Sequence, residues 1–112
     1  MDARELMIGD YVCVPSELNR IKRIQSTFDL DEAVLYEPIM ITPEILEKNG
    51  FDRYGSRIYI LENDDFTIQI KTGKYVRVFS RMDCNAKFDT DFTVHKLQHA
   101  MRLCGIKKEI VL

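Results

Sequence analysis

Two histidines come nearest, by residue type and spacing, to a metal site in this chain. His95 and His99 stand four residues apart, so on a helix both imidazoles can reach one metal ion from the same face. A third ligand does not follow from the pattern, because Cys104 falls in an apolar stripe. We therefore expect no metal and no other cofactor, and His95 and His99 remain secondary site candidates.

A second pattern could bind single-stranded nucleic acid. On such surfaces bases stack on aromatic rings while guanidinium groups contact phosphates, and Tyr75, Arg77, Phe79 and Arg81 alternate in this way. The isoelectric point of about 5.7 argues against a general polyanion binder. Burial of both sides of the strand inside the protein explains the same alternation, so nucleic-acid binding is the alternative hypothesis.

The remaining reactive residues indicate no catalysis. The acidic segments 29–32, 64–65 and 89–91 lack the spacing of a calcium loop, and we expect solvated turns there. Cys13, Cys84 and Cys104 are expected to be small core residues rather than nucleophiles. No phosphate-binding loop or nucleophile elbow is present in the sequence. We therefore expect a protein that is not an enzyme.

The composition is that of one globular domain. The chain has 112 residues, of which 46% are hydrophobic and 30% charged. It contains no apolar run near the roughly 20 residues of a membrane span, and no signal peptide is apparent. An odd number of cysteines without paired spacing favours a cytoplasmic protein. Residues 1–56 carry 6 Lys and Arg against 11 Asp and Glu, whereas residues 57–112 carry 10 against 7.

The clearest predicted element is a helix over 94–104. Thr93 can cap its start and Gly105 can supply the left-handed residue that ends it. At about 100° per residue the helix has one apolar face and one polar face, and we expect the apolar face to pack on a sheet. The apolar face holds Val94, Leu97, Ala100, Met101 and Cys104, and the polar face holds His95, Gln98, His99 and Arg102.

Shorter elements precede this helix. Residues 1–37 predict a β-meander, resembling an SH3-like curled sheet, with strands near 11–14, 20–24 and 33–36. The link 37–41 separates it from a compact helix that begins after Thr42 and ends at Gly50, with Pro43 in the first turn. Residues 107–112 predict a last edge strand.

Residues 57–80 give the strongest strand pattern, and loop length decides which side chains share a face. A two-residue turn at Thr72–Gly73 would place Ile68 beside Arg77. A three-residue loop over 71–73 instead pairs Ile68 with Val76 and Phe66 with Val78, which keeps the aliphatic face whole. The same reasoning makes 63–65 a three-residue loop. The predicted core face then holds Ile58, Ile60, Phe66, Ile68, Ile70, Val76 and Val78.

The opposite face of these strands becomes the candidate partner-binding surface. It is too apolar to be left fully exposed, so either the meander or a partner should cover it. An antiparallel two-fold dimer is the simplest partner arrangement, and the edge strand 108–112 is a second candidate binding element. The predicted surface holds Tyr59, Leu61, Tyr75, Arg77, Phe79 and Arg81.

Three segments resemble a family of small uncharacterised proteins common in Bacteroides and related gut bacteria. They are a Gly-Asp-Tyr-Val turn at 9–12, the stretch 38–51 that starts Pro-Ile-Met-Ile-Thr, and a Val-His-Lys-Leu-Gln helix start at 94–98. The resemblance implies a bacterial cytoplasmic protein and carries no known activity, cofactor or catalytic residue.

These observations predict one α+β domain over 1–112. It has an N-terminal β-meander, a short helix, and a three-stranded antiparallel sheet with one C-terminal helix packed on it. The expected function is a small non-catalytic protein-binding or self-associating module, with a protein partner or a second copy and no membrane contact. The alternative is a nucleic-acid accessory factor using Tyr75, Arg77, Phe79 and Arg81.

Overall fold

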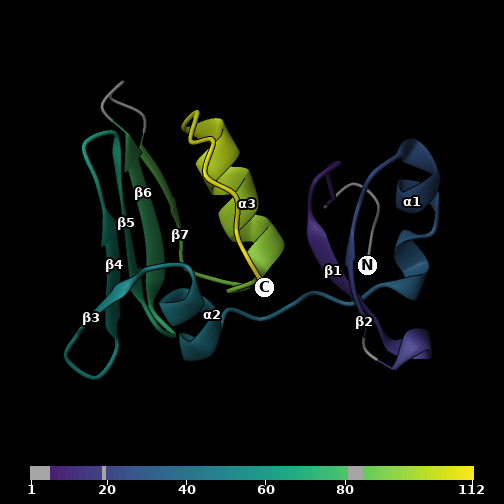
Figure 1. Ribbon diagram of the computed structural model, residues 1–112, viewed down its shortest axis with the longest axis horizontal. Coiled ribbons are helices and arrows are strands. Elements are labelled where there is room, and N and C mark those ends of the chain that lie inside the picture. The colour runs from purple at the N-terminus through teal and green to yellow at the C-terminus, as the bar shows by residue number, and fades with distance from the viewer. Residues whose placement is uncertain (1–5, 19, 81–84) are drawn as a thin grey trace. The chain divides into compact units, whose positions relative to one another are not determined.

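The computed structural model is an α+β structure with two antiparallel sheets, and it describes residues 6–18, 20–80 and 85–112. The chain forms two compact units, one of residues 1–40 with 93–95 and the other of residues 41–92 with 96–112. The elements of both units are labelled in Figure 1. Among the described residues, no helix has the length and apolar character that crossing a bilayer requires.

The first unit is built on one hairpin. Strands β1 (Tyr11–Val14) and β2 (Arg20–Arg23) pair antiparallel, and the 3-10 helix η2 (Pro15–Glu17) lies between them. Alternate β1 residues point into a small core, as the period of a strand requires. The buried members of this core are Leu6, Val12, Val14, Ile24, Ala33 and Tyr36.

The predicted third strand of the meander is wrong. Residues 27–31 form helix α1 (Thr27–Asp31), and residues 33–35 form the 3-10 helix η3 (Ala33–Leu35). Ser26 begins α1, because its hydroxyl accepts a hydrogen bond from the Asp29 N–H at 3.4 Å. The four-residue apolar run 33–36 fits a strand or a helical turn equally well, and here it forms a 3-10 turn that follows directly after α1. The SH3-like expectation is therefore not supported.

Asp29 also joins a polar cluster beside this core. Its carboxylate accepts from the Gln25 N–H at 2.9 Å and lies 3.0 Å from the Lys22 ammonium group. The Gln25 hydrogen bond, followed by the Lys22 contact, lowers the pKa of Asp29, and the Asp29 hydrogen bond raises the pKa of Lys22. Burial raises the pKa of the neighbouring Tyr36. The expected solvated turn is thus an ion-paired helix.

The compact helix of the second unit is confirmed. In α2 (Pro43–Lys48) the Thr42 hydroxyl accepts from the Ile45 N–H at 3.3 Å, and Pro43 stands in the first turn. Gly50 ends the turn that follows with a φ of +84°, a value that favours glycine. Leu46 is buried at 1% exposure and anchors the helix.

The predicted strand over 107–112 does not form. The Asn49 side chain takes the place of a pairing strand, because its amide donates to the Val111 carbonyl and accepts from the Val111 N–H at 2.8 and 2.7 Å. Ile106 and Ile110 are buried. This segment is therefore an extended arm held by Asn49, and its backbone is less open to a partner than a free edge strand would be.

The main sheet has five strands rather than three. They are β3 (Asp52–Tyr54), β4 (Ile58–Glu62), β5 (Phe66–Lys71), β6 (Tyr75–Ser80) and β7 (Asn85–Phe88) in sequential order. The two edge strands, β3 and β7, were not predicted. All three β3 residues are exposed, so the sequence carries no apolar alternation there.

The loop between β5 and β6 has three residues, as predicted, but it lies over 72–74. Ile68 therefore pairs with Val78, and not with Val76 as expected. The pairing moves by two residues along β6, so the same β6 side chains still face the core as predicted. Phe66, Ile68, Ile70, Val76 and Val78 are all buried on one face, which confirms this part of the predicted core.

The β4 part of the predicted core face, Ile58 and Ile60, is wrong because the loop between β4 and β5 is shorter than expected. This loop is a two-residue turn, Asp64–Asp65, closed by a hydrogen bond from the Asn63 N–H to the Phe66 carbonyl at 3.0 Å. The Asn63 side chain accepts from the Asp65 and Phe66 N–H groups at 2.8 and 2.9 Å. Because the loop has one residue fewer than predicted, the opposite set of β4 side chains faces the core, and Tyr59 pairs with Ile70 there.

Helix α3 (Val94–Leu103) is confirmed, with its five predicted apolar residues buried and Gly105 at a φ of +70°. Figure 1 shows it along one side of the sheet, and the Cys104 thiol donates to the Val78 carbonyl at 3.8 Å. The predicted polar face is partly wrong, because His95 and Gln98 are buried. Residues 93–95 belong to the first unit, where the Val94 N–H donates to the Ile39 carbonyl, a contact that apolar spacing does not reveal.

Candidate functional site

The five-stranded sheet has two faces that differ in composition. We call the face that holds Tyr59, Ile68 and Val78 the inner face, and the face formed by the alternate residues the outer face. Figure 1 shows α3 along only one side of the sheet, and the Cys104 contact with Val78 identifies that side as the inner face. The outer face holds Asp52, Tyr54, Ile58, Ile60, Glu62, Thr67, Gln69, Lys71, Tyr75, Arg77, Phe79, Asn85 and Lys87.

Strand pairing sets the outer-face side chains in three rows across β4, β5 and β6. Directly paired side chains on one face lie about 4.5–5.5 Å apart at their Cβ atoms, so each row is contiguous. Every member except the exposed Glu62 is half-buried. The middle row is Ile60, Gln69 and Arg77, and the flanking rows are Ile58, Lys71 and Tyr75 on one side and Glu62, Thr67 and Phe79 on the other.

Tyr75 is held in place by its polar and cationic neighbours. Its hydroxyl accepts from the Gln69 side-chain amide at 3.1 Å. The Arg77 guanidinium lies 4.7 Å from the ring centroid and the Lys87 ammonium 5.8 Å from it, both within the range of a cation–π contact. The aromatic ring therefore presents a fixed edge with two cations beside it.

The two ends of the central strands carry opposite charge. One end holds the β5–β6 loop and the β3–β4 loop, which are joined by a hydrogen bond from the Thr72 N–H to the Arg57 carbonyl at 2.9 Å. The other end holds the acidic turn at Asp64. Within the described residues none of these six side chains has an ion-pair partner. The basic end carries Arg57, Lys71 and Lys74, and the acidic end carries Glu62, Asp64 and Asp65.

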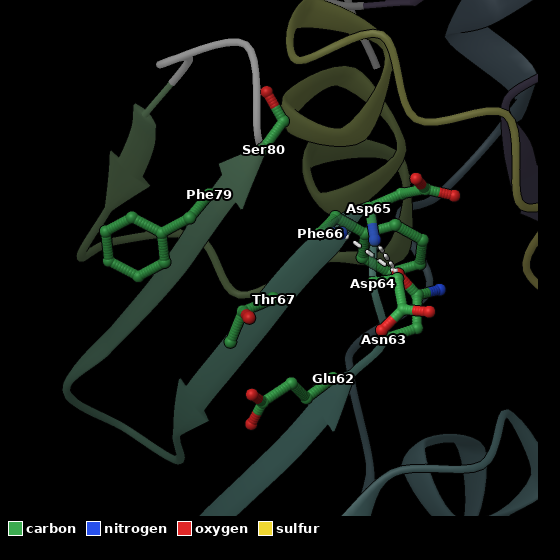
Figure 2. Close-up of a pocket in the computed structure, with 8 residues that line it drawn as sticks. All are labelled: Glu62, Asn63, Asp64, Asp65, Phe66, Thr67, Phe79 and Ser80. Atoms are coloured by element: carbon green, nitrogen blue, oxygen red, sulfur yellow. Dashed lines mark hydrogen bonds between the residues drawn. The ribbon is translucent and has the colours of Figure 1, made fainter.

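A hollow of about 360 Å³ lies at the acidic end. Figure 2 shows Glu62, Thr67 and Phe79 projecting from one side of the strands, with Phe66 directed to the opposite side. The outer-face part of the lining thus combines an aromatic ring, a hydroxyl and a carboxylate. Such a lining suits a side chain that is both long and basic, or an aromatic ring with a polar tip. The hollow is lined by Glu62, Asn63, Asp64, Asp65, Phe66, Thr67, Phe79 and Ser80.

The structure brings together only part of the predicted partner-binding surface. Tyr75, Arg77 and Phe79 lie together on the outer face, whereas Tyr59 and Leu61 lie on the inner face because the β4–β5 turn has two residues. Arg81 is outside the described residues, as is Cys84. Sequence reasoning missed Ile58, Ile60, Gln69, Lys71 and Lys87 as outer-face residues. The signal that could have placed Ile58 and Ile60 was Asn63, a turn-forming residue directly before two aspartates, whereas Gln69 and Lys71 follow from the alternation of β5.

The secondary candidates do not converge on a site. His95 is buried and His99 half-buried. In the described part of the chain, no three or more His, Cys, Asp or Glu side chains are grouped so as to hold a metal ion. Cys13 and Cys104 take part in no disulfide among the described residues; Cys13 is half-buried and Cys104 is buried.

Comparison with known proteins adds no relative. No protein-family model matches the chain, and no curated protein or solved structure shows significant similarity to it. The resemblance to the Bacteroides family therefore stays a prediction, and the functional argument depends on the sheet.

Proposed function

We propose that this protein is a non-catalytic binding module that associates with a second copy of itself through the outer face. The observation that supports the proposal is the pairing register, which places Ile58, Ile60, Tyr75 and Phe79 on one half-buried face. The apolar and aromatic side chains of β4 and β6 flank the polar β5 residues Thr67, Gln69 and Lys71, and a mixed face with aromatic and Arg side chains is typical of a non-obligate protein interface. We also propose a bacterial cytoplasmic location, which the absence of a disulfide at Cys13 and Cys104 among the described residues favours.

Sedimentation velocity at micromolar concentration tests the proposal directly. The wild-type protein should form a dimer, and Phe79→Glu should reduce it to a monomer, because a carboxylate would be buried in an apolar contact. Leu103→Glu is the matched control, since Leu103 is 73% exposed and lies on α3, away from the outer face. Circular dichroism verifies that both variants fold. A monomeric wild type, or a dimer that Phe79→Glu leaves intact, contradicts the proposal.

A second candidate function is binding of single-stranded nucleic acid on the same face. The observation that favours it is the group of cations, Lys71, Arg77 and Lys87, around the Tyr75 ring. Phosphate contacts release counterions, so such binding weakens steeply with salt. Fluorescence anisotropy with a labelled oligonucleotide at low ionic strength is the test. Binding that is lost in Arg77→Glu would support this function, and no binding to any oligonucleotide would exclude it.

A further inference from the structure

We infer that the outer face holds a binding site for a single phosphate group, at the place where β5, β6 and β7 lie side by side. The ligand is a small phosphomonoester. The inference shares its cations with the second candidate function, but it names a compact ligand instead of a nucleic-acid strand, and it does not depend on association with a second copy. The residues of the site are Lys71, Tyr75, Arg77 and Lys87.

Two cations of this site are placed directly opposite each other by the sheet register. Arg77 on β6 pairs with Lys87 on β7, and both side chains belong to the outer face. Like charges in directly opposite positions destabilise a sheet. A dianion bound between them changes this repulsion into attraction, because each cation then donates a charge-assisted hydrogen bond to an anionic oxygen.

The same two side chains converge on the Tyr75 ring. The Arg77 guanidinium lies 4.7 Å from the ring centroid, and the Lys87 ammonium lies 5.8 Å from it. Lys71 pairs directly with Tyr75 between β5 and β6, so a third ammonium group is within reach of the same place. Three positive charges thus gather at one ring, and a phosphate monoester carries a charge of about −1.5 to −2 at pH 7.

The Tyr75 hydroxyl adds a neutral donor to the site. Its oxygen accepts a hydrogen bond from the Gln69 side-chain amide at 3.1 Å, and its proton has no acceptor among the residues that the structure describes. The bond from Gln69 holds the oxygen in place and leaves the O–H able to donate. The oxygens of a phosphate group are strong acceptors for such a donor.

No carboxylate neutralises these cations. Within the described part of the chain, Lys71, Arg77 and Lys87 form no ion pair. The acid nearest to Lys87 in the sequence is Asp89, which is exposed and also forms no ion pair with a described residue. The described residues therefore supply no counter-charge at this place.

The surroundings of the cations favour a compact ligand over a nucleic-acid strand. Across the sheet, the row of Arg77 and Lys87 ends at Asp52 on β3. Along the strands in one direction, the face ends at Glu62 and the acidic turn that follows it. In the other direction the face ends one row beyond Arg77, a distance of about 7 Å. A strand would soon leave the face or bring its phosphates near carboxylates, whereas one phosphate group stays beside the cations.

NMR titration with inorganic phosphate at constant ionic strength tests the site. The amide signals of Tyr75, Arg77 and Lys87 should shift and saturate, and Arg77→Gln and Lys87→Gln should each weaken binding by about tenfold. Lys107→Gln is the matched control, because Lys107 is exposed on the segment after α3, and its affinity should equal that of the wild type. The same spectra verify that each variant folds. Shifts that do not saturate, or an equal loss in all three variants, would overturn the inference.

Methyl phosphate and dimethyl phosphate then distinguish a monoester from the diester of a nucleic-acid backbone. At about pH 7.5 the monoester is mostly a dianion, because its second pKa is about 6. It should bind at least tenfold more tightly than the diester, which carries one charge. Equal binding of the two would overturn the inference and favour the second candidate function. Sedimentation measures the proposed self-association separately, so neither result depends on it.

Discussion

The inner and outer faces of the sheet are made by alternate residues of the same strands, yet they differ in almost every physical property. On β5 the inner residues Ile68 and Ile70 are 0% and 1% exposed, while Gln69 between them is half-buried and polar. The inner face is closed by aliphatic packing, and the outer face is organised by hydrogen bonds and cation–π contacts around Tyr75. The inner face therefore supplies the buried core of the sheet, and the outer face is the one on which the proposed association depends.

The difference between the faces depends on one turn. The two-residue turn at Asp64–Asp65 directs Tyr59 to the inner face and Ile60 to the outer face. A loop longer by one residue would exchange them, because a strand has a side-chain period of two. Surface composition is thus controlled by loop length as well as by the residues in the strands.

The largest expected effect contrasts the same substitution on the two faces. Ile68→Ala should lower the free energy of unfolding by about 2–5 kcal/mol, because it leaves a cavity in the inner core. Ile60→Ala, on the outer face, should cost only about 1 kcal/mol, since the side chain is half-buried. Urea denaturation at low protein concentration measures both. Equal losses would show that the two faces are not separated as the register indicates.

The elements that could be predicted from the sequence are those with a local signal. Thr42, Pro43 and Gly50 marked α2, and Gly105 marked the end of α3, because caps and left-handed residues act over a few positions. The aliphatic alternation of β5 and β6 likewise indicated the correct core residues. The predicted binding surface therefore had its β6 residues on the correct face of the sheet and its β4 residues, Tyr59 and Leu61, on the wrong face.

The remaining errors arise where one pattern fits two structures. The run 33–36 fits a strand or a 3-10 turn, and 107–112 fits a strand or an arm held by Asn49. Strand β3 has no exposed–buried alternation at all. The Asn49 side chain replaces backbone hydrogen bonds to Val111, 62 residues further along the chain, and such a contact is visible only once the distant segment is placed.

The second prediction concerns the turn that separates the faces. Asn63→Ala should lower the free energy of unfolding by about 1–2 kcal/mol, because the Asp65 and Phe66 N–H groups lose their acceptor. Asp64→Ala serves as the control in the same exposed turn and should stay within about 0.5 kcal/mol of wild type. Urea denaturation measures both variants. A larger loss at Asp64 than at Asn63 would mean that another contact sets the turn.

The third prediction weakens the organisation of the outer face alone. Arg77→Met keeps most of the length of the side chain but removes the cation beside Tyr75, and it should cost about 0.5–1 kcal/mol. Lys74→Met removes an exposed charge from the neighbouring loop and should have a smaller effect. Thermal denaturation of the two variants compares them. A stability change at Arg77 no greater than that at Lys74 would mean that this pair does not organise the face.

The smallest expected effect on stability lies in the first unit, at the ion pair of Lys22 and Asp29. Hydrogen bonds from Gln25 and Lys22 keep the pKa of Asp29 below its ordinary value of 3.8. The resulting stabilisation is present above pH 3.8 and is lost as the pH falls through the lowered pKa of the folded state. NMR titration of the Asp29 carboxyl group should show this pKa, and Lys22→Met should move it upward. An unchanged titration in the variant would assign the shift to the backbone hydrogen bonds alone.

The central position of β5 has a consequence for the time scale on which the protein opens. Amides of β5 are paired on both sides, to β4 and to β6, so their hydrogen exchange requires unfolding of the whole sheet. Amides of the exposed edge strand β3 exchange through local fraying. The proposed association with a second copy would stabilise the folded state by mass action. Exchange in β5 should therefore slow as protein concentration rises, while exchange in β3 keeps its rate.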